Sequence, residues 1–178
     1  MAEDLEEPEF KLICEYETFE VRQYMDTVQA RVASYNDKNE KPRMHFRKIA
    51  SYIFGNNDKI EEISMTAPVH MWKENNKDFM AFTMPSKYNL KELPKPNDGE
   101  IQLLNVKSDI VAVLTFSWFA GQTKTSKLIK ELQNMIETEG LKRKGTPKLA
   151  VYDNPMTTLP FMRRNEIHLP IEWPINRQ

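Results

Sequence analysis

The segment VRQYMDTVQARV (Val21–Val32) predicts two short strands that meet at a turn. Val28, Ala30 and Val32 alternate with polar residues, which is the pattern of a strand with one buried face. Met25 and Asp26 mark the turn. The same plan returns later in LLNVKSDIVAVL, which ends at Leu114 and turns around Ser108 and Asp109. The two segments therefore indicate a repeated unit, and each should continue in the same way.

Each strand pair is followed by an amphipathic pattern that predicts a helix. The first helix is expected over about Pro42–Phe54, because proline suits the first helical position and Gly55 is a favourable C-terminal cap. The second is expected over about Thr125–Glu139, before Gly140. Apolar residues at helical spacing give each helix one buried face: Phe46, Ile49, Ala50 and Ile53 in the first, and Leu128, Leu132, Met135 and Ile136 in the second.

Two more strand-like runs follow each helix: ISMTAPVHMW and FMAFTMPSKY after the first, KLAVYDNP and NEIHLPIEW after the second. The chain thus reads β-β-α-β-β twice, over about residues 19–92 and 100–171. This order predicts an α+β fold in which about eight mostly antiparallel strands form a distorted barrel with two flanking helices. No linker divides residues 1–178, so we expect a single domain, with residues 1–9 as a flexible acidic tail.

Charge and composition exclude several classes of function. The formal net charge is −1, with both signs interspersed, so neither nucleic acid nor an acidic membrane is an expected partner. Cys14 is the only cysteine, which excludes an internal disulfide and a multi-cysteine metal site. The start MAEDLEEPEF has no signal-peptide pattern, and no run resembles a membrane span or suggests membrane insertion. We expect a cytoplasmic protein; its oligomeric state is not predicted.

Ten methionines and three histidines raise the question of a metal or haem site. Met65, Met80 and Met84 fall on core-facing strand positions, where methionine fills irregular gaps. The same thioethers could instead form a deformable wall around a flat apolar ligand. The histidines are scattered: His45 lies in the first helix, and His168 alternates with apolar neighbours onto a face expected to be solvated.

The sequence contains no set of residues that is diagnostic of catalysis. Only five glycines are present, and neither a phosphate-binding loop nor a nucleophile elbow occurs. Adjacent Arg163 and Arg164 could form a solvated rim or bind a ligand carboxylate. An enzyme acting on a hydrophobic small molecule would depend on Glu62, Tyr152 or Glu166 as acid or base. Whether the protein is an enzyme is therefore left open.

Three stretches carry a resemblance to a known family: FRKIASYIFGNNDKIEEISMTAPV, then FTMPSKY with LPKPNDGEI, and VYDNPMTTLPFMRRNEIHL. In this order and spacing they resemble the SOUL haem-binding protein family, over about Phe19–Leu169. The resemblance implies two β-β-α-β-β halves and a relation to effector-binding domains of bacterial regulators. It also implies haem or another tetrapyrrole as the cofactor, seated in a shallow apolar cleft beside the first helix.

Carried onto this chain, the resemblance implies a binding site at Arg43, His45, Phe46, Lys48 and Ile49. Phe46 and Ile49 would cover the porphyrin face, and Arg43 or Lys48 would pair with its propionates. Some relatives have a histidine, suggested as the axial iron ligand, where this chain has Gln23 in FEVRQY. Glutamine is a poor ligand for iron, so iron would have to use another residue such as His45 or a methionine, or the haem would be bound by apolar contacts without a ligand to its iron.

The leading hypothesis is therefore a soluble carrier or buffer for haem or a related tetrapyrrole, a small planar apolar ligand that it does not transform. The alternatives are the enzyme considered above and a protein-interaction module without a small ligand. The protein-interaction module predicts a filled core, with no cavity beside the first helix.

Overall fold

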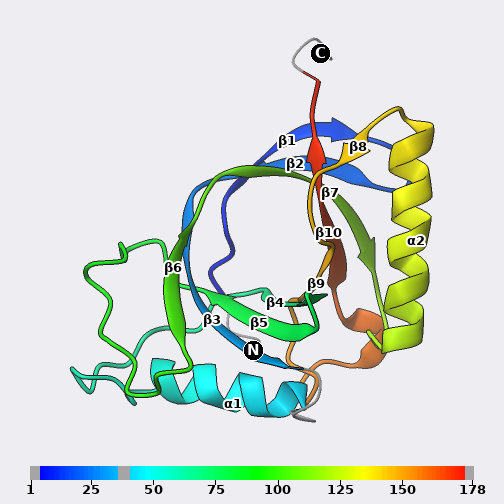
Figure 1. Cartoon of the computed structure of the whole chain (residues 1–178). Helices are drawn as coiled ribbons and strands as arrows, with labels where there is room; N and C mark the ends of the chain where they lie inside the picture. The colour runs from blue at the N-terminus through cyan, green and yellow to red at the C-terminus, as the bar shows by residue number, and fades with distance from the viewer. Residues whose placement is uncertain (1–4, 36–40, 175–178) are drawn as a thin grey trace. The chain divides into compact units, whose positions relative to one another are not determined.

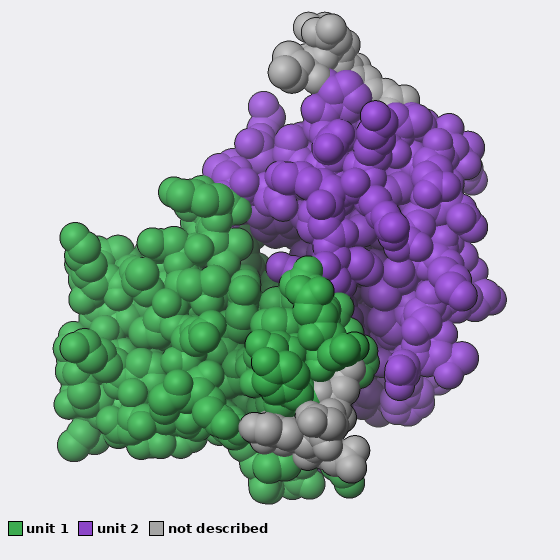
Figure 2. All heavy atoms as spheres, viewed as in Figure 1, with its two compact units in different colours: residues 1–8, 26–107 green, residues 9–25, 108–178 purple. Residues whose placement is uncertain are grey.

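The computed structural model describes residues 5–35 and 41–174. These residues form two compact units, which Figure 2 distinguishes by colour. Unit 1 comprises residues 1–8 and 26–107, and unit 2 comprises residues 9–25 and 108–178. Both units therefore contain strands from the first and the second half of the sequence.

Unit 1 is an antiparallel sheet with one helix, α1 (Pro42–Ile53), on one face (Figure 1). Its strands follow the order β4-β5-β3-β6. They are β3 (Thr27–Tyr35), β4 (Val69–Glu74), β5 (Lys77–Thr83) and β6 (Gln102–Val106). Alternation along β3 sends Val28, Ala30 and Val32 toward α1, where they join the apolar core of the unit.

Unit 2 has the same construction around the longer helix α2 (Gln122–Thr138), which packs on β7 and β10. Its sheet has the order β1-β2-β7-β10-β9, and β8 pairs with β10. The strands are β1 (Phe10–Glu15), β2 (Glu20–Tyr24), β7 (Asp109–Phe116), β8 (Lys142–Arg143), β9 (Lys148–Val151) and β10 (Asn165–Glu172), with the short 3-10 helix η2 (Pro160–Met162) before β10. Val21, Ala112, Leu132 and Ile167 are completely buried in its core.

The expected α+β class and antiparallel strand pairing are confirmed, and so is the order β-β-α-β-β in each half. Both helix assignments are correct to within three residues at either end, and Gly55 and Gly140 follow them with φ of 105° and 69°. The described residues add two strands that were not expected, β1 and β8. The strand expected from Ile63 begins only at Val69, after Pro68, whose missing N–H removes a ladder bond.

The turns that marked the repeat join strands that do not pair with each other. β2 pairs with β1 and β7, while β3 pairs with β5 and β6. Each turn therefore carries the chain from one compact unit to the other, and the boundaries 19–92 and 100–171 remain a prediction. Of the expected tail, residues 1–4 lie outside the described residues. The Glu6 carbonyl accepts a bond from the Ala67 N–H (2.9 Å), and its carboxylate accepts one from the Ser86 N–H (2.6 Å).

Among the described residues, no helix combines the length and apolar character needed to cross a bilayer.

Candidate functional site

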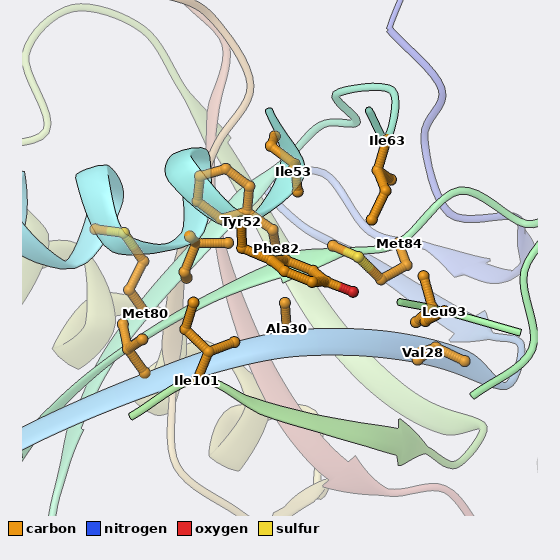
Figure 3. Close-up of a cluster of buried hydrophobic side chains, with 12 residues drawn as sticks. Val28, Ala30, Tyr52, Ile53, Ile63, Met80, Phe82, Met84, Leu93 and Ile101 are labelled. Carbon is orange, nitrogen blue, oxygen red and sulfur yellow. The ribbon is translucent and has the colours of Figure 1, made fainter. Parts of the chain in front are cut away.

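Helix α1 holds all five residues that the resemblance implies, but it does not place them on one surface. Ile49 is completely buried and belongs to the core of unit 1. Tyr52 and Phe82, at 0% and 2% exposure, belong to the same core (Figure 3). Phe46 is 40% exposed, and its ring lies 5.3 Å from that of Phe82. Arg43 is exposed. Ile49 is therefore part of the core, and only Phe46 of the two apolar residues can offer a surface to a ligand.

The remaining positions follow from the pitch of the helix. At about 100° per residue, Arg43 and Phe46 lie on one flank of the buried stripe and Lys48 lies on the other. Lys48 forms an ion pair with Glu100. Arg43 and Lys48, the two cations considered as propionate partners, therefore lie on opposite flanks of α1. Only Arg43 lies on the same flank as Phe46.

His45 points into unit 1. Its side chain is 3% exposed, and Nε2 lies 2.8 Å from the Ser34 hydroxyl. An imidazole in this position stabilises the contact between α1 and β3, and it can reach a ligand only if that hydrogen bond breaks. Among the described residues, no group of three or more His, Cys, Asp or Glu side chains is placed to hold a metal ion.

The methionines divide between core and margin. Met80 and Met84 are buried at 3% and 4% exposure, which confirms the packing interpretation for both (Figure 3). Met65 and Met71 are partly buried at the edge of the same cluster. Val69, the neighbour of Phe82 on the adjacent strand, is also partly buried there. Thioethers therefore do form part of a half-exposed wall, on the face of the sheet that α1 covers.

A group of hydrogen-bonded polar side chains lies in unit 2, on the face of the sheet away from α2, and we call it the Glu166 network. Glu166 is 1% exposed. Its carboxylate accepts hydrogen bonds from Arg22 Nη1 (3.1 and 3.2 Å), the Tyr152 hydroxyl (2.6 Å) and His168 Nε2 (2.7 Å). Arg22 also donates to Glu20 (2.7 Å) and to the hydroxyl of Tyr24 (3.0 Å).

Electrostatics determine the charge state of this network. Burial acts to raise the pKa of Glu166, but the bonds from His168 and Tyr152 and the positive charge of Arg22 outweigh it and lower the pKa to about 2. Burial lowers the pKa of His168, so its imidazole is neutral at pH 7. Because a carboxylate only accepts hydrogen bonds, Nε2 of His168 must carry the proton. Burial and then the charge of Glu166 raise the pKa of Tyr152.

The network brings together two of the three residues considered for acid–base chemistry. Tyr152 and Glu166 are bonded to each other, whereas Glu62 is exposed and belongs to unit 1. The expectation that His168 is solvated is wrong: it lies on the face opposite Ile167 and Leu169, as its alternation predicts, but is only 5% exposed. Sequence reasoning missed the network, although the two-residue period placed Glu166 and His168 on one face.

Arg163 and Arg164 do not form a simple solvated rim. Arg163 donates to the carbonyls of Thr158 (3.0 Å) and Pro155 (2.8 Å), so part of its guanidinium is used to hold a loop. The guanidinium of Arg164 lies 3.8 Å from the centre of the Tyr152 ring.

Gln23 lines an open pocket of about 370 Å³ in unit 2. The pocket is lined by Gln23, Ser108, Asp109, Ile110, Lys144, Ile171, Glu172 and Trp173. Lys144 and Asp109 form an ion pair within it, at 3.0 Å. Gln23 belongs to unit 2 and α1 to unit 1, so the two family features carried onto this chain fall in different compact units.

Comparison with known proteins identifies the family. The sequence matches the family model described as SOUL heme-binding protein over residues 5–170. No curated protein matches the chain.

Solved structures share the fold at low sequence identity. A hydrolase from Listeria innocua is 9% identical with a TM-score of 0.61, and the match covers 89% of this chain and 94% of that one. An uncharacterized conserved protein from Listeria innocua is 9% identical with a TM-score of 0.65, covering 87% and 92%. The C-terminal domain of EcmrR is 11% identical with a TM-score of 0.62, covering 86% and 96%. At these identities the likeness concerns the fold alone.

Proposed function

Because the chain belongs to the SOUL heme-binding protein family, we propose that it binds haem or a related tetrapyrrole and carries or buffers it in the cytoplasm without transforming it. The observation that carries the proposal is the half-exposed ring of Phe46, which contacts the ring of Phe82. Arg43 lies on the same flank of α1 as Phe46. A flat aromatic ligand requires an apolar surface of this kind with a cation at its margin.

In this proposal, residues of α1 and β4 form the ligand face. Phe46 supplies an aromatic ring, and Val69 and Met71, both partly buried, lie on the same face of the sheet as Phe82. We call these three residues the Phe46 strip. Methionine adapts to irregular shapes and its sulfur contacts aromatic rings favourably, so Met71 suits the edge of a planar ligand.

We expect the propionates of the ligand to bind Arg43. Arg43 lies one helical turn before Phe46, within reach of a carboxylate at the edge of a ring that covers Phe46. Lys48 is engaged with Glu100 on the other flank and would have to leave that pair to take part. A guanidinium can bind a carboxylate through two parallel hydrogen bonds, which also orients the ring.

Recognition of the ring does not require iron to be ligated. His45 is the histidine of α1 considered as an axial ligand, and its Nε2 is bonded to Ser34 in the interior of the unit. In this proposal the Phe46 strip contacts the ring of the ligand and Arg43 binds its propionates. When haem is bound it supplies the chemistry of its iron, and the role of the chain is to hold the ring and to shield one face from water.

Variants of the strip test the proposal in absorbance titrations with ferric haem and with metal-free protoporphyrin. Phe46→Ala is expected to lower the affinity for both ligands by about tenfold, because it removes most of an aromatic contact surface. Arg43→Glu should weaken them by a similar factor through charge repulsion. Phe54→Ala is the matched control, since Phe54 caps α1, is 63% exposed and lies outside the strip. If Phe46→Ala and the wild type have equal affinities, the ligand binds another surface of the protein. If the wild type binds neither ligand, the proposed function is wrong.

The second candidate is an enzyme, and the bond between Tyr152 and Glu166 favours it. A tyrosine beside a carboxylate can serve as an acid–base pair, although a Glu166 pKa of about 2 makes this carboxylate a weak base. Incubation with a panel of porphyrins and aromatic esters tests this candidate. Turnover that Tyr152→Phe abolishes, with an unchanged circular dichroism spectrum, would support it; no turnover of any substrate would remove it.

A further inference from the structure

Two loops of unit 2 expose an unusual number of large apolar side chains. The first loop lies between β7 and α2, and the second lies between β9 and β10 and includes η2. In Figure 1 the second loop is the orange segment beside the N-terminal end of α2. The six side chains, which we call the loop patch, are Trp118 (53% exposed), Phe119 (61%), Met156 (89%), Leu159 (56%), Phe161 (56%) and Met162 (64%).

Hydrogen bonds fix these loops to each other. The N–H of Trp118 donates to the carbonyl of Pro160 (2.9 Å), and the carbonyl of Trp118 accepts from Asn165 Nδ2 (3.0 Å). Trp118 adopts a φ of 74°, which is uncommon for a residue with a side chain. Its ring lies 6.3 Å from that of Phe161. The exposed rings are therefore presented by an ordered backbone, which limits the conformational entropy lost when they are covered.

The segments that carry the loop patch have a positive net charge. The two loops and the first turn of α2 contain Lys124, Arg163 and Arg164, and Asp153 is the only acid of residues 117–124 and 153–164. Lys124 donates to the carbonyl of Ser117 (2.7 Å), and Arg163 lies over the ring of Phe119 at 5.3 Å. The chain as a whole has a net charge of −1, so this cationic character is local, and the expectation that an acidic membrane is not a partner rested on the net charge alone.

We propose that the loop patch docks the protein on the surface of an anionic phospholipid bilayer. Tryptophan and phenylalanine favour the interface between headgroups and acyl chains, and adjacent lysine and arginine side chains bind anionic headgroups. Charge complementarity favours a bilayer over a protein partner, because three cations belong to the same loops and the adjoining helix turn as the apolar side chains, which occupy loops instead of a flat sheet or helix face. The attachment is peripheral, with side chains reaching the interface and no helix crossing it. It does not depend on tetrapyrrole binding, which uses residues of unit 1.

Vesicle co-sedimentation of the full chain tests the proposal. Vesicles of phosphatidylcholine with about 30 mol% phosphatidylserine should bind the wild type, and pure phosphatidylcholine vesicles should bind it several-fold more weakly. The double variant Trp118→Ala with Phe161→Ala should lose about tenfold or more in affinity for the mixed vesicles. Ile60→Ser is the matched control and should bind as the wild type does, because Ile60 is 85% exposed but belongs to unit 1.

A second variant tests the proposal even if the double variant does not fold. Met156→Glu alters a side chain that is 89% exposed, so it leaves the core intact, and it should weaken binding to the anionic vesicles by about fivefold. Absence of vesicle binding by the wild type, or equal binding by all variants, would overturn the proposal. It would also be overturned if the double variant abolished only concentration-dependent self-association in sedimentation velocity, since the patch would then be a protein interface.

Discussion

Replacing Glu166 by glutamine is expected to lower the free energy of unfolding by about 3 kcal/mol at pH 7. The carboxylate is 1% exposed and holds Arg22, Tyr152 and His168. Its pKa of about 2, against 4.5 for an isolated glutamate, corresponds to about 3 kcal/mol of preference for the ionised form in the folded protein. Breaking a buried ion pair by removing one partner costs a similar amount, since the other charge remains buried.

The sign of the pH dependence follows from the same pKa values. Because the pKa of Glu166 is lower in the folded protein than in the unfolded chain, its stabilisation is complete above about pH 4.5 and is lost as the pH falls toward 2. The lowered pKa of His168 acts in the same direction below its usual value of 6.5, because acid protonates this imidazole first in the unfolded chain. The His168 effect remains in Glu166→Gln, so the two proteins differ through Glu166 itself, and the wild type should lose stability more steeply than the variant below about pH 4.5.

Urea unfolding followed by circular dichroism at pH 7, 5 and 3 measures both effects. Glu20→Gln is the matched control: Glu20 also accepts from Arg22, but its side chain is 35% exposed, so the loss should be below about 1 kcal/mol. A loss below about 1 kcal/mol in Glu166→Gln, or parallel pH profiles of this variant and wild type, would refute the reasoning.

Three further predictions concern the core, a tyrosine and the pocket. Ile49→Ala should cost about 3 kcal/mol in urea unfolding and Phe46→Ala clearly less, because Ile49 is completely buried and Phe46 is 40% exposed; equal losses would contradict this burial. Burial raises the pKa of Tyr52 to about 12, so phenolate absorbance at 295 nm should include a component absent from Tyr52→Phe that titrates near pH 12 while the protein stays folded. Gln23→His should shift the Soret band of bound haem only if the pocket lined by Gln23, and not the Phe46 strip, is the binding site.

Much of the fold was predictable because local patterns agree with it. Val28, Ala30 and Val32 alternate as the buried face of β3 requires, and Gly55 and Gly140 follow the two helices. The pairing of strands was not predictable. Arg22 and Glu166 are 144 residues apart, and the register that brings them together depends on β2 pairing with β7 and β7 with β10.

The candidate site was predicted only in part, for a similar reason. Helical spacing identified the apolar stripe of α1 that contains Ile49 and Phe46. It did not predict that Ile49 is completely buried while Phe46 stays 40% exposed. The position of Lys48 on the other flank follows from the pitch, whereas its pairing with Glu100 depends on a loop 52 residues away. The solvation expected for His168 was wrong because alternation indicates a face, not whether that face is covered.

The most direct test of tetrapyrrole recognition is an absorbance titration of the wild type with ferric haem and with metal-free protoporphyrin, repeated on His45→Ala. The structure, with His45 bonded to Ser34 in the interior, predicts that both ligands saturate at one equivalent and that the variant, if folded, binds them as the wild type does. Binding of haem alone, lost in a folded His45→Ala variant, would contradict recognition of the ring, and binding of neither ligand would contradict the proposed function itself.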